Sequence, residues 1–219
     1  MFTGIIEHSG TIESLDVRAD GGRVTIHAPR LALAVSGSIA VNGCCLTITS
    51  TSKSRFSADL SVETLRRTSF GTTNGRLTKG ARVNLELPLT AGKEFGGHFV
   101  LGHIDSVGHV AHLTPEGENW CYGIEVPDEI ARYIVPKGSI TIDGVSFTVA
   151  RWLRSPRLTL QIAVIPYTYE HTNIRDRRPG DAVNLEADIL GKYIERHLTA
   201  RQAEPASRLA IRDLIEQGF

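Results

Sequence analysis

The chain repeats part of its own sequence. Ser38–Thr49 reappears as Ser139–Ala150, and Val83–Glu86 recurs without change as Val183–Glu186. Both matches share an offset of about a hundred residues, which is too long for a solenoid unit and suits a whole small domain. The sequence therefore predicts a duplicated domain, and the differences between its two halves are the best guide to what it does.

Each half is rich in short β-type runs separated by glycine-containing turns. Asn42-Gly43 and Asp143-Gly144 each stand between alternating apolar residues, and both dipeptides favour the positive φ angles of a tight hairpin turn. Asp20–Gly22 marks a further hairpin, between Thr11–Val17 and Arg23–Ala28. We expect about six short antiparallel strands in each half, arranged as a barrel or a sandwich.

Two segments are expected to be helical. Ser61–Arg67 follows the strand Phe56–Leu60 as a short helix, and apolar residues recur at helical spacing over Ile189–Leu198. Pro205 interrupts this pattern before it resumes over Ala206–Gln217. The C-terminal helix either packs on its own barrel or meets a partner helix, and the spacing alone does not decide between the two.

The composition excludes several classes of protein. The 219 residues include 24 basic and 24 acidic side chains, so neither a nucleic-acid surface nor a membrane surface is indicated. Three cysteines, two of them adjacent, do not make a disulfide framework. With no leader-like or membrane-spanning apolar segment, the sequence predicts a soluble protein of the cytoplasm.

Small polar side chains occupy one face of the strand that follows each hairpin turn. Cys45 and Thr47 share that face in the first half, and Ser146 and Thr148 share it in the second. Such a face is either turned to solvent or forms the wall of a pocket that binds a flat, polar ligand. Cys45 is accordingly either a nucleophile or an unreactive buried thiol.

The second half has ionisable residues at positions where the first half has none. His103 aligns with Ile5, Asp188 replaces a proline and Lys137 replaces a serine. His103 is either a base that works near neutral pH or a hydrogen-bonded structural residue. A metal site shared with His98 is disfavoured, because the two histidines would face opposite sides of a strand.

Several motifs occur together and in a fixed order. They are Met1–Ile6, Asn42–Thr47, Phe95–His103, Lys137–Ile140 with Asp143-Gly144, and Asn184–Asp188 with Lys192-Tyr193. Together they resemble the riboflavin synthase family of the α-chain type, from Met1 to about Leu198. The resemblance implies an all-β fold with a C-terminal α-helix. Two tandem six-stranded antiparallel Greek-key barrels would occupy residues 1–97 and 98–188, and a helical segment over 189–219 would join three subunits.

The resemblance also implies a reaction that uses neither a metal nor a cofactor. Two molecules of 6,7-dimethyl-8-ribityllumazine dismutate: one donates a four-carbon unit to the other, giving riboflavin and 5-amino-6-(ribitylamino)uracil. This transferase chemistry fits the unequal halves, because one substrate acts as donor and the other as acceptor. In the family each barrel binds one lumazine, and the N-terminal barrel of one subunit of a homotrimer faces the C-terminal barrel of its neighbour. Association with lumazine synthase stays open.

The site residues implied by the resemblance fall into two groups. With Phe2 packing against it, the first site is expected to be lined by Gly4, Ile5, Ile6, Cys45, Leu46, Thr47, Asp59, Leu60, Ser61, Val62, Glu63 and Thr64. The second site is expected to be lined by Gly102, His103, Ile104, Lys137, Ser146, Phe147, Thr148, Ile165, Pro166, Tyr167, Thr168, Tyr169 and Glu170. Near these loops, Tyr167, Arg175 and Ser69-Phe70 depart from the usual family pattern.

The implied catalytic residues are Cys45, His103, Ser146, Thr148 and Asp188. His103, aided by Thr148, would move the proton of the C7 methyl group of one lumazine. Cys45 or Ser146 would supply or position the nucleophile at C7, and Asp188 would orient a neighbouring group or shuttle a proton. Two rival hypotheses are a non-catalytic lumazine- or flavin-binding protein and a structural barrel that binds partners through its helix. Polar pocket residues in both halves favour the enzyme.

Overall fold

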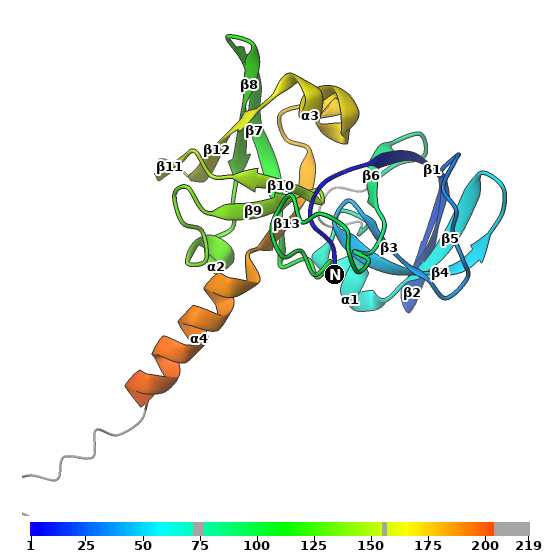
Figure 1. Ribbon diagram of the computed structural model, residues 1–219, viewed down its shortest axis with the longest axis horizontal. Helices are drawn as coiled ribbons and strands as arrows, with labels where there is room; N and C mark the ends of the chain where they lie inside the picture. The colour runs from blue at the N-terminus through cyan, green and yellow to red at the C-terminus, as the bar shows by residue number, and fades with distance from the viewer. Residues whose placement is uncertain (72–76, 155–156, 204–219) are drawn as a thin grey trace, which may run out of the picture.

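The computed structural model describes residues 1–71, 77–154 and 157–203, which form two β-rich units and one extended helix (Figure 1). Each unit corresponds to one half of the duplicated sequence. The first unit contains β1 (His8–Arg18), β2 (Gly21–His27), β3 (Ser38–Val41), β4 (Cys44–Thr51), β5 (Arg55–Leu60) and β6 (Arg82–Glu86). These strands form a closed barrel in the order β1-β2-β5-β4-β3-β6, and all of the pairings are antiparallel.

The second unit keeps the same cyclic order of strands, but its fourth strand is divided in two. It contains β7 (Ser106–Glu116), β8 (Asn119–Glu125), β9 (Ser139–Ile142), β10 (Val145–Thr148), β11 (Arg151–Arg154), β12 (Leu158–Val164) and β13 (Ala182–Ala187). The order β10-β9-β13-β7-β8-β12-β11 places the two parts of the divided strand at opposite edges of a seven-stranded sheet. This unit is therefore a curled sheet of seven strands, whereas the resemblance implied a six-stranded Greek-key barrel.

The division arises where the fourth strand passes from one neighbouring strand to the other. In the first unit the register of β4 with β5 shifts between Ile48 and Ser50. In the second unit the Val149 N–H donates a hydrogen bond to Gly138 O, just before β9, at 2.9 Å. The next N–H, that of Ala150, donates to Gln161 O of β12 at 3.0 Å. The same bend is thus a bulge in one unit and a break in the other.

The hairpin turns at Asn42-Gly43 and Asp143-Gly144 and the short helix after Phe56–Leu60 are confirmed. Asn42 and Asp143 have φ angles of 44° and 46°, and each precedes a glycine with positive φ, as a tight hairpin turn requires. Helix α1 (Val62–Arg67) begins after Ser61, whose side chain accepts a hydrogen bond from Thr64 N at 3.0 Å. The second unit also contains the short helices α2 (Asp128–Ala131), α3 (Pro166–His171) and η1 (Asn173–Asp176).

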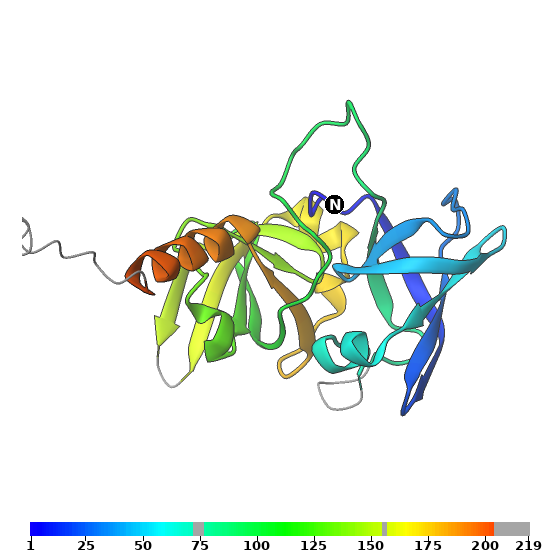
Figure 2. The same ribbon diagram turned by 90° about the horizontal axis from the view of Figure 1, so that it is seen from below.

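Helix α4 (Ile189–Ala203) follows β13 and extends away from both β units (Figure 1). Figure 2 shows that it starts on the side of the second unit and points away from the first. Its apolar side chains Leu190, Tyr193, Ile194 and Leu198 are between 54% and 67% exposed. The sequence allowed this helix either to pack on its own barrel or to meet a partner helix. The exposure of its apolar face shows that this face does not pack on its own barrel. The further helix expected over Ala206–Gln217 lies outside the described residues.

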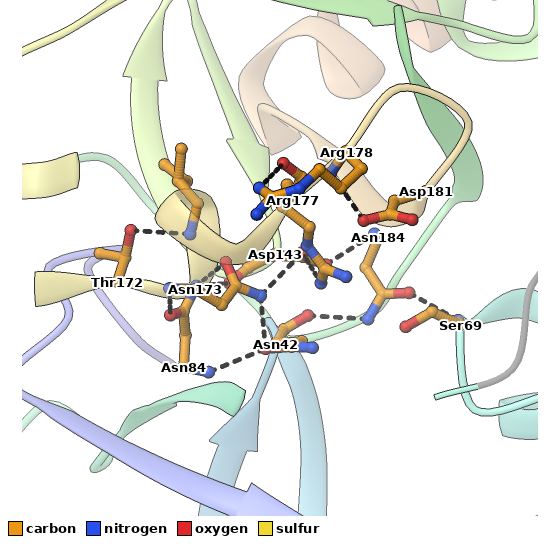
Figure 3. A network of polar contacts seen from close by, with 11 residues as sticks. Asn42, Ser69, Asn84, Asp143, Thr172, Asn173, Arg177, Arg178, Asp181 and Asn184 are labelled. Atoms are coloured by element: carbon orange, nitrogen blue, oxygen red, sulfur yellow. Dashed lines mark hydrogen bonds and ion pairs between the residues drawn. The ribbon is translucent and has the colours of Figure 1, made fainter. Parts of the chain in front are cut away.

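A buried polar network joins the two units where their hairpin turns meet (Figure 3). Asn42 Oδ1 accepts a hydrogen bond from Asn84 N at 2.8 Å, and Asp143 Oδ1 accepts one from Asn184 N at 2.9 Å. Asn84 Nδ2 also donates to Asp143 O, and Asn184 Nδ2 to Asn42 O, both at 2.8 Å. Each asparagine of the repeated Val-Asn-Leu-Glu sequence thus binds the turn of its own unit and the turn of the other.

Candidate functional site

The chain segment that leads into each unit lies against the other unit. Cys45 N, on β4 of the first unit, donates a hydrogen bond to Gly102 O at 2.8 Å. Ser146 N, at the matching position on β10 of the second unit, donates to Gly4 O at 2.8 Å. The two leading segments therefore cross, and each completes a surface that begins on the opposite unit.

This crossing corrects the grouping expected for the two sites. Residues 4–6, expected at the first site, lie on the second unit, and residues 102–104, expected at the second site, lie on the first. The cores show the same exchange, because Ile104 packs against the core of the first unit and Ile6 against that of the second. The expected grouping was wrong because it assigned each segment to its own half of the sequence, whereas the fold exchanges them.

A cleft of about 500 Å³ opens on the first unit, beside α1 and the crossing segment. The volume lies within the range of small-molecule binding sites. The expected site residues that line it are Cys45, Glu63, Thr64, Gly102, His103 and Ile104. We refer to this cleft as the first-unit site.

Three charged side chains of the first-unit site were not among the expected site residues. Asp105 Oδ1 forms an ion pair with Lys192 Nζ of α4 at 2.6 Å, and Asp105 Oδ2 accepts a hydrogen bond from Ala187 N at 2.8 Å. Arg67 Nη1 of α1 donates to Asp105 O at 3.3 Å. Asp105 therefore ties α1 and the start of α4 to the same cleft, so the position of α4 affects the geometry of the site.

Several side chains expected at the first site point elsewhere. Leu46 and Leu60 are 3% and 2% exposed and pack in the barrel core, because side chains alternate in direction along a strand. Asp59 pairs with Arg23 on the outer surface, with 2.6 Å between Oδ1 and Nε. Ser61 is occupied as the N-cap of α1. The side chains of Leu46 and Leu60 are therefore turned away from the cleft, and those of Asp59 and Ser61 already have hydrogen-bond partners.

The matching surface of the second unit, which we call the second-unit site, contains a buried histidine. His98 is 7% exposed, and its Nδ1 lies 2.7 Å from Ser146 Oγ while its Nε2 lies 3.1 Å from Thr141 Oγ1. A neutral imidazole offers one donor and one acceptor, and each hydroxyl can complement either, so this row of three side chains is satisfied. Burial lowers the pKa of His98, and the negative charge of Asp188 opposes that shift. His98 is therefore neutral near pH 7 and can accept a proton from Ser146.

Sequence reasoning did not assign His98 a functional role. His98 stands just before the segment that matches the start of the chain. No residue of the first half therefore aligns with it, and a comparison of the two halves could not single it out. Hydroxyl groups engage both of its ring nitrogens, and His103 lies against the opposite unit. The signal that could have identified it is its place in Phe95–His103, a motif already noted for the resemblance.

The two sites differ in the chemistry around Cys45 and Ser146. Ala40 lies opposite Cys45 across β3 and β4, whereas Thr141 lies opposite Ser146 across β9 and β10. Cys45 packs against a buried apolar cluster that includes Phe2. The thiol therefore stands in an apolar setting and the hydroxyl in a polar one, so the two sites are chemically unequal.

Other residues expected at the second site differ in how far they are exposed. Thr148 and Lys137 are exposed, while Phe147 is 8% exposed and packs in the core. Asp188 Oδ1 accepts a hydrogen bond from Leu190 N at 3.0 Å, at the start of α4. The structure thus brings Asp188 into electrostatic contact with His98 but separates Thr148, on the second unit, from the cleft that contains His103.

Helix α3, which belongs to the second unit, carries two stacked aromatic side chains. Tyr169 stacks on Trp120, with ring centroids 3.8 Å apart and an interplanar angle of 5°. Tyr167, which departs from the usual family pattern, is 67% exposed and stacks on His171 at 4.1 Å. An exposed, stacked ring of this kind offers a surface for a flat ligand.

Residues 3–88 and 101–188 each match the lumazine binding domain family, in agreement with the two β units. The chain is 43% identical to the riboflavin synthase of Actinobacillus pleuropneumoniae over 222 residues, covering all of both chains. It is 41% identical to that of Mycobacterium bovis, over 90% of this chain and 97% of the relative. The chain belongs to the riboflavin synthase family. Within this family, the riboflavin synthase of Bacillus subtilis is 37% identical over the whole of both chains.

Solved structures with the same fold contain a bound lumazine or a bound flavin. The crystal structure of LumP complexed with 6,7-dimethyl-8-(1'-D-ribityl) lumazine has a TM-score of 0.75 at 25% identity, covering 85% of this chain and 99% of that chain. LumP complexed with riboflavin has the same TM-score of 0.75. Within the described part of this family member, the helices lack the length and apolar character needed to span a membrane.

Proposed function

We propose that this protein is a riboflavin synthase, a transferase that dismutates two molecules of 6,7-dimethyl-8-ribityllumazine. One molecule donates a four-carbon unit to the other, which gives riboflavin and 5-amino-6-(ribitylamino)uracil. The observation that carries the proposal is the pair of related but chemically unequal sites on one chain of this family. A dismutation needs such inequality, because two identical molecules must react in different roles.

Each unit binds one lumazine in this proposal. Residues 1–97 and 98–188 form the two binding domains, and each domain contributes residues to the site of the other; the hydrogen bonds from Cys45 N to Gly102 O and from Ser146 N to Gly4 O support this exchange. The first-unit site combines a cleft of about 500 Å³ with polar and apolar walls, which suits a flat heterocycle with a polar side chain. LumP, which shares the fold, was crystallised with this lumazine, and this supports the choice of ligand.

The proposed catalytic groups are divided between the two sites. His103 and Cys45 act at the first-unit site, while Ser146 and Asp188 act at the second, with His98 as the base that accepts the proton of Ser146. Thr148 assists His103 only if the first-unit site of one subunit faces the second-unit site of another. Such an arrangement would hold two rings face to face and remove about 7–11 kcal/mol of barrier for ideal alignment.

The remaining parts of the proposal concern assembly and location. The exposed apolar face of α4 supports a homotrimer joined by residues 189–219, which would bring sites of different subunits together. The three cysteines are free, which supports a reducing compartment such as the cytoplasm.

Turnover is the direct test of the proposed function. Purified protein mixed with dimethylribityllumazine is expected to develop riboflavin fluorescence, and Cys45→Ser and His103→Ala are each expected to lower kcat about 100-fold. Cys121→Ser, which does not line the first-unit cleft, is the control. Binding of the lumazine without riboflavin would support the non-catalytic alternative, and full activity in both variants would contradict the roles given to Cys45 and His103.

Replacement of His98 tests its role as the base at the second-unit site. His98→Gln keeps a donor and an acceptor but cannot take up a proton, so kcat is expected to fall about 100-fold. Because burial lowers the pKa of His98, the wild-type rate is expected to decline only below the ordinary histidine pKa, where the imidazole becomes charged. The variant should lose this acidic decline. The pH profile of kcat gives the answer, with the exposed His109→Gln as control.

A further inference from the structure

The glutamate that ends each Val-Asn-Leu-Glu sequence has no role in the chemistry described above. Glu86 ends β6 and Glu186 lies near the end of β13, and both residues are only 2% exposed. A buried carboxylate is costly unless donors surround it. The groups that donate hydrogen bonds to each glutamate therefore indicate its role.

Each carboxylate binds consecutive backbone N–H groups of one crossing segment. Glu86 Oε1 accepts from Thr3 N at 2.6 Å and from Thr3 Oγ1 at 2.8 Å, while Glu86 Oε2 accepts from Gly4 N at 3.0 Å. Glu186 accepts from Leu101 N at 2.7 Å and from Gly102 N at 3.0 Å, again with one oxygen for each. Hydrogen bonds to an ionised carboxylate are about twice as strong as neutral ones.

The bound segments lead directly into the site residues of the opposite unit. Gly4 precedes Ile5 and accepts a hydrogen bond from Ser146 N, and Gly102 precedes His103 and accepts one from Cys45 N. We propose that Glu86 and Glu186 are positioning residues, each of which holds in place the segment that completes the substrate site of the opposite unit. The inference rests on the proposed function, and it explains why this glutamate occurs at the same place in both halves.

The two glutamates are not equivalent. Thr3 gives Glu86 a third donor through its hydroxyl, whereas Leu101 at the matching position offers only its N–H. Burial raises the pKa of Glu186 to about 7, and that of Glu86 is also raised, against the hydrogen bonds of Thr3 and Gly4. The segment at the first-unit site is therefore the one that loosens when pH falls through this value, because Glu186 then takes up a proton.

The charged and titratable groups near Glu186 agree with the uptake of a proton by Glu186 as the pH falls. Lys192 of α4 favours the ionised form of Glu186, and Asp105 opposes it. The Cys44 thiol, whose pKa burial raises to about 12, stays neutral. Lys192 and Asp105 neutralise each other as an ion pair at 2.6 Å. The N–H groups of Leu101 and Gly102 remain the contacts that depend on the charge of Glu186.

The test compares Glu186→Gln with Glu86→Gln, using the exposed Glu116→Gln as control. A glutamine directs its NH₂ group at one of the two N–H donors, so one hydrogen bond is lost. In Glu186→Gln, amide hydrogen exchange is expected to accelerate about tenfold at Leu101 and Gly102 but not at Thr3 and Gly4, and Glu86→Gln should show the reverse. The apparent KM of Glu186→Gln is expected to rise about tenfold with kcat changed less than about threefold.

A second variant covers the case in which Glu186→Gln does not fold. Leu101→Thr gives Glu186 a hydroxyl donor like the one that Thr3 gives Glu86. This extra hydrogen bond favours the ionised form of Glu186, so the pH at which acidification weakens substrate binding should fall below about 7. Unchanged exchange at Leu101 and Gly102 in Glu186→Gln, or an unmoved pH dependence in Leu101→Thr, would overturn the proposal. If the wild type makes no riboflavin, the proposed function fails, but hydrogen exchange still tests the two glutamates.

Discussion

Gly102→Ala is expected to lower riboflavin formation by about 100-fold or more, since displacement of site residues by about 1 Å can cost this much. A Cβ atom on Gly102 would lie 2.5 Å from Cys45 Cβ and 3.0 Å from Cys45 N. The crossing segment would have to leave β4, taking His103 with it. The rate of riboflavin formation under saturating lumazine measures the loss.

Gly80 provides a matched control for this substitution. Gly102 and Gly80 have φ angles of +82° and +88°, so alanine is strained at either position. A Cβ at Gly80 would meet nothing within 4 Å. Gly80→Ala is therefore expected to cost only the backbone strain of about 1–2 kcal/mol in the free energy of unfolding and to keep its activity. Equal activities of the two variants would show that the close approach of Gly102 to Cys45 is not needed.

Asp143→Ala is expected to lower the free energy of unfolding by about 3–5 kcal/mol, because it leaves a buried arginine without its partner. Asp143 is 1% exposed and forms an ion pair with Arg177, whose side chain is 11% exposed. The carboxylate also accepts hydrogen bonds from Asn173 Nδ2 and Asn184 N, both at 2.9 Å. The loss therefore falls on the network that joins the two units (Figure 3).

Chemical denaturation measures this effect, and two further variants show its origin. Asp16→Ala removes the partner of Arg18 from a solvent-exposed pair and is expected to lower the free energy of unfolding far less than Asp143→Ala does, because water already solvates both charges. Asp143→Ala combined with Arg177→Met removes both charges and is expected to recover part of the lost stability. A loss for Asp143→Ala as small as that for Asp16→Ala would mean that the polar network does not hold the units together.

Much of the fold could be predicted because its signals are local. The duplication can be read from matching segments, and Asn42-Gly43 specifies a hairpin turn through the φ angles that those two residues tolerate. Helix α1 begins at Ser61 because a serine side chain can accept the hydrogen bond of a nearby N–H. The split of the fourth strand in the second unit was not predicted, since it depends on which neighbouring strand each residue of that bend pairs with.

The candidate sites were predicted less completely. Cys45 and Ser146 were identified by their residue type and by alternation along a strand, and both lie beside a crossing segment. The grouping of residues 4–6 and 102–104 was wrong, and His98 was not recognised as a partner of Ser146. The grouping has no local signal in the sequence, and the signal for His98 is its place in the Phe95–His103 motif.

The sequence by itself determined that the protein is built from two related β units with a hairpin turn at matching places in each. These features depend on residues that are neighbours along the chain. Only the tertiary structure decided which segment completes which site, because the decisive contacts join residues far apart. His98 meets Ser146 across 48 positions, and Glu186 meets Leu101 across 85. Such contacts form only when the strands and the segments that lead into them pack together, so no periodicity or spacing along the chain reveals them.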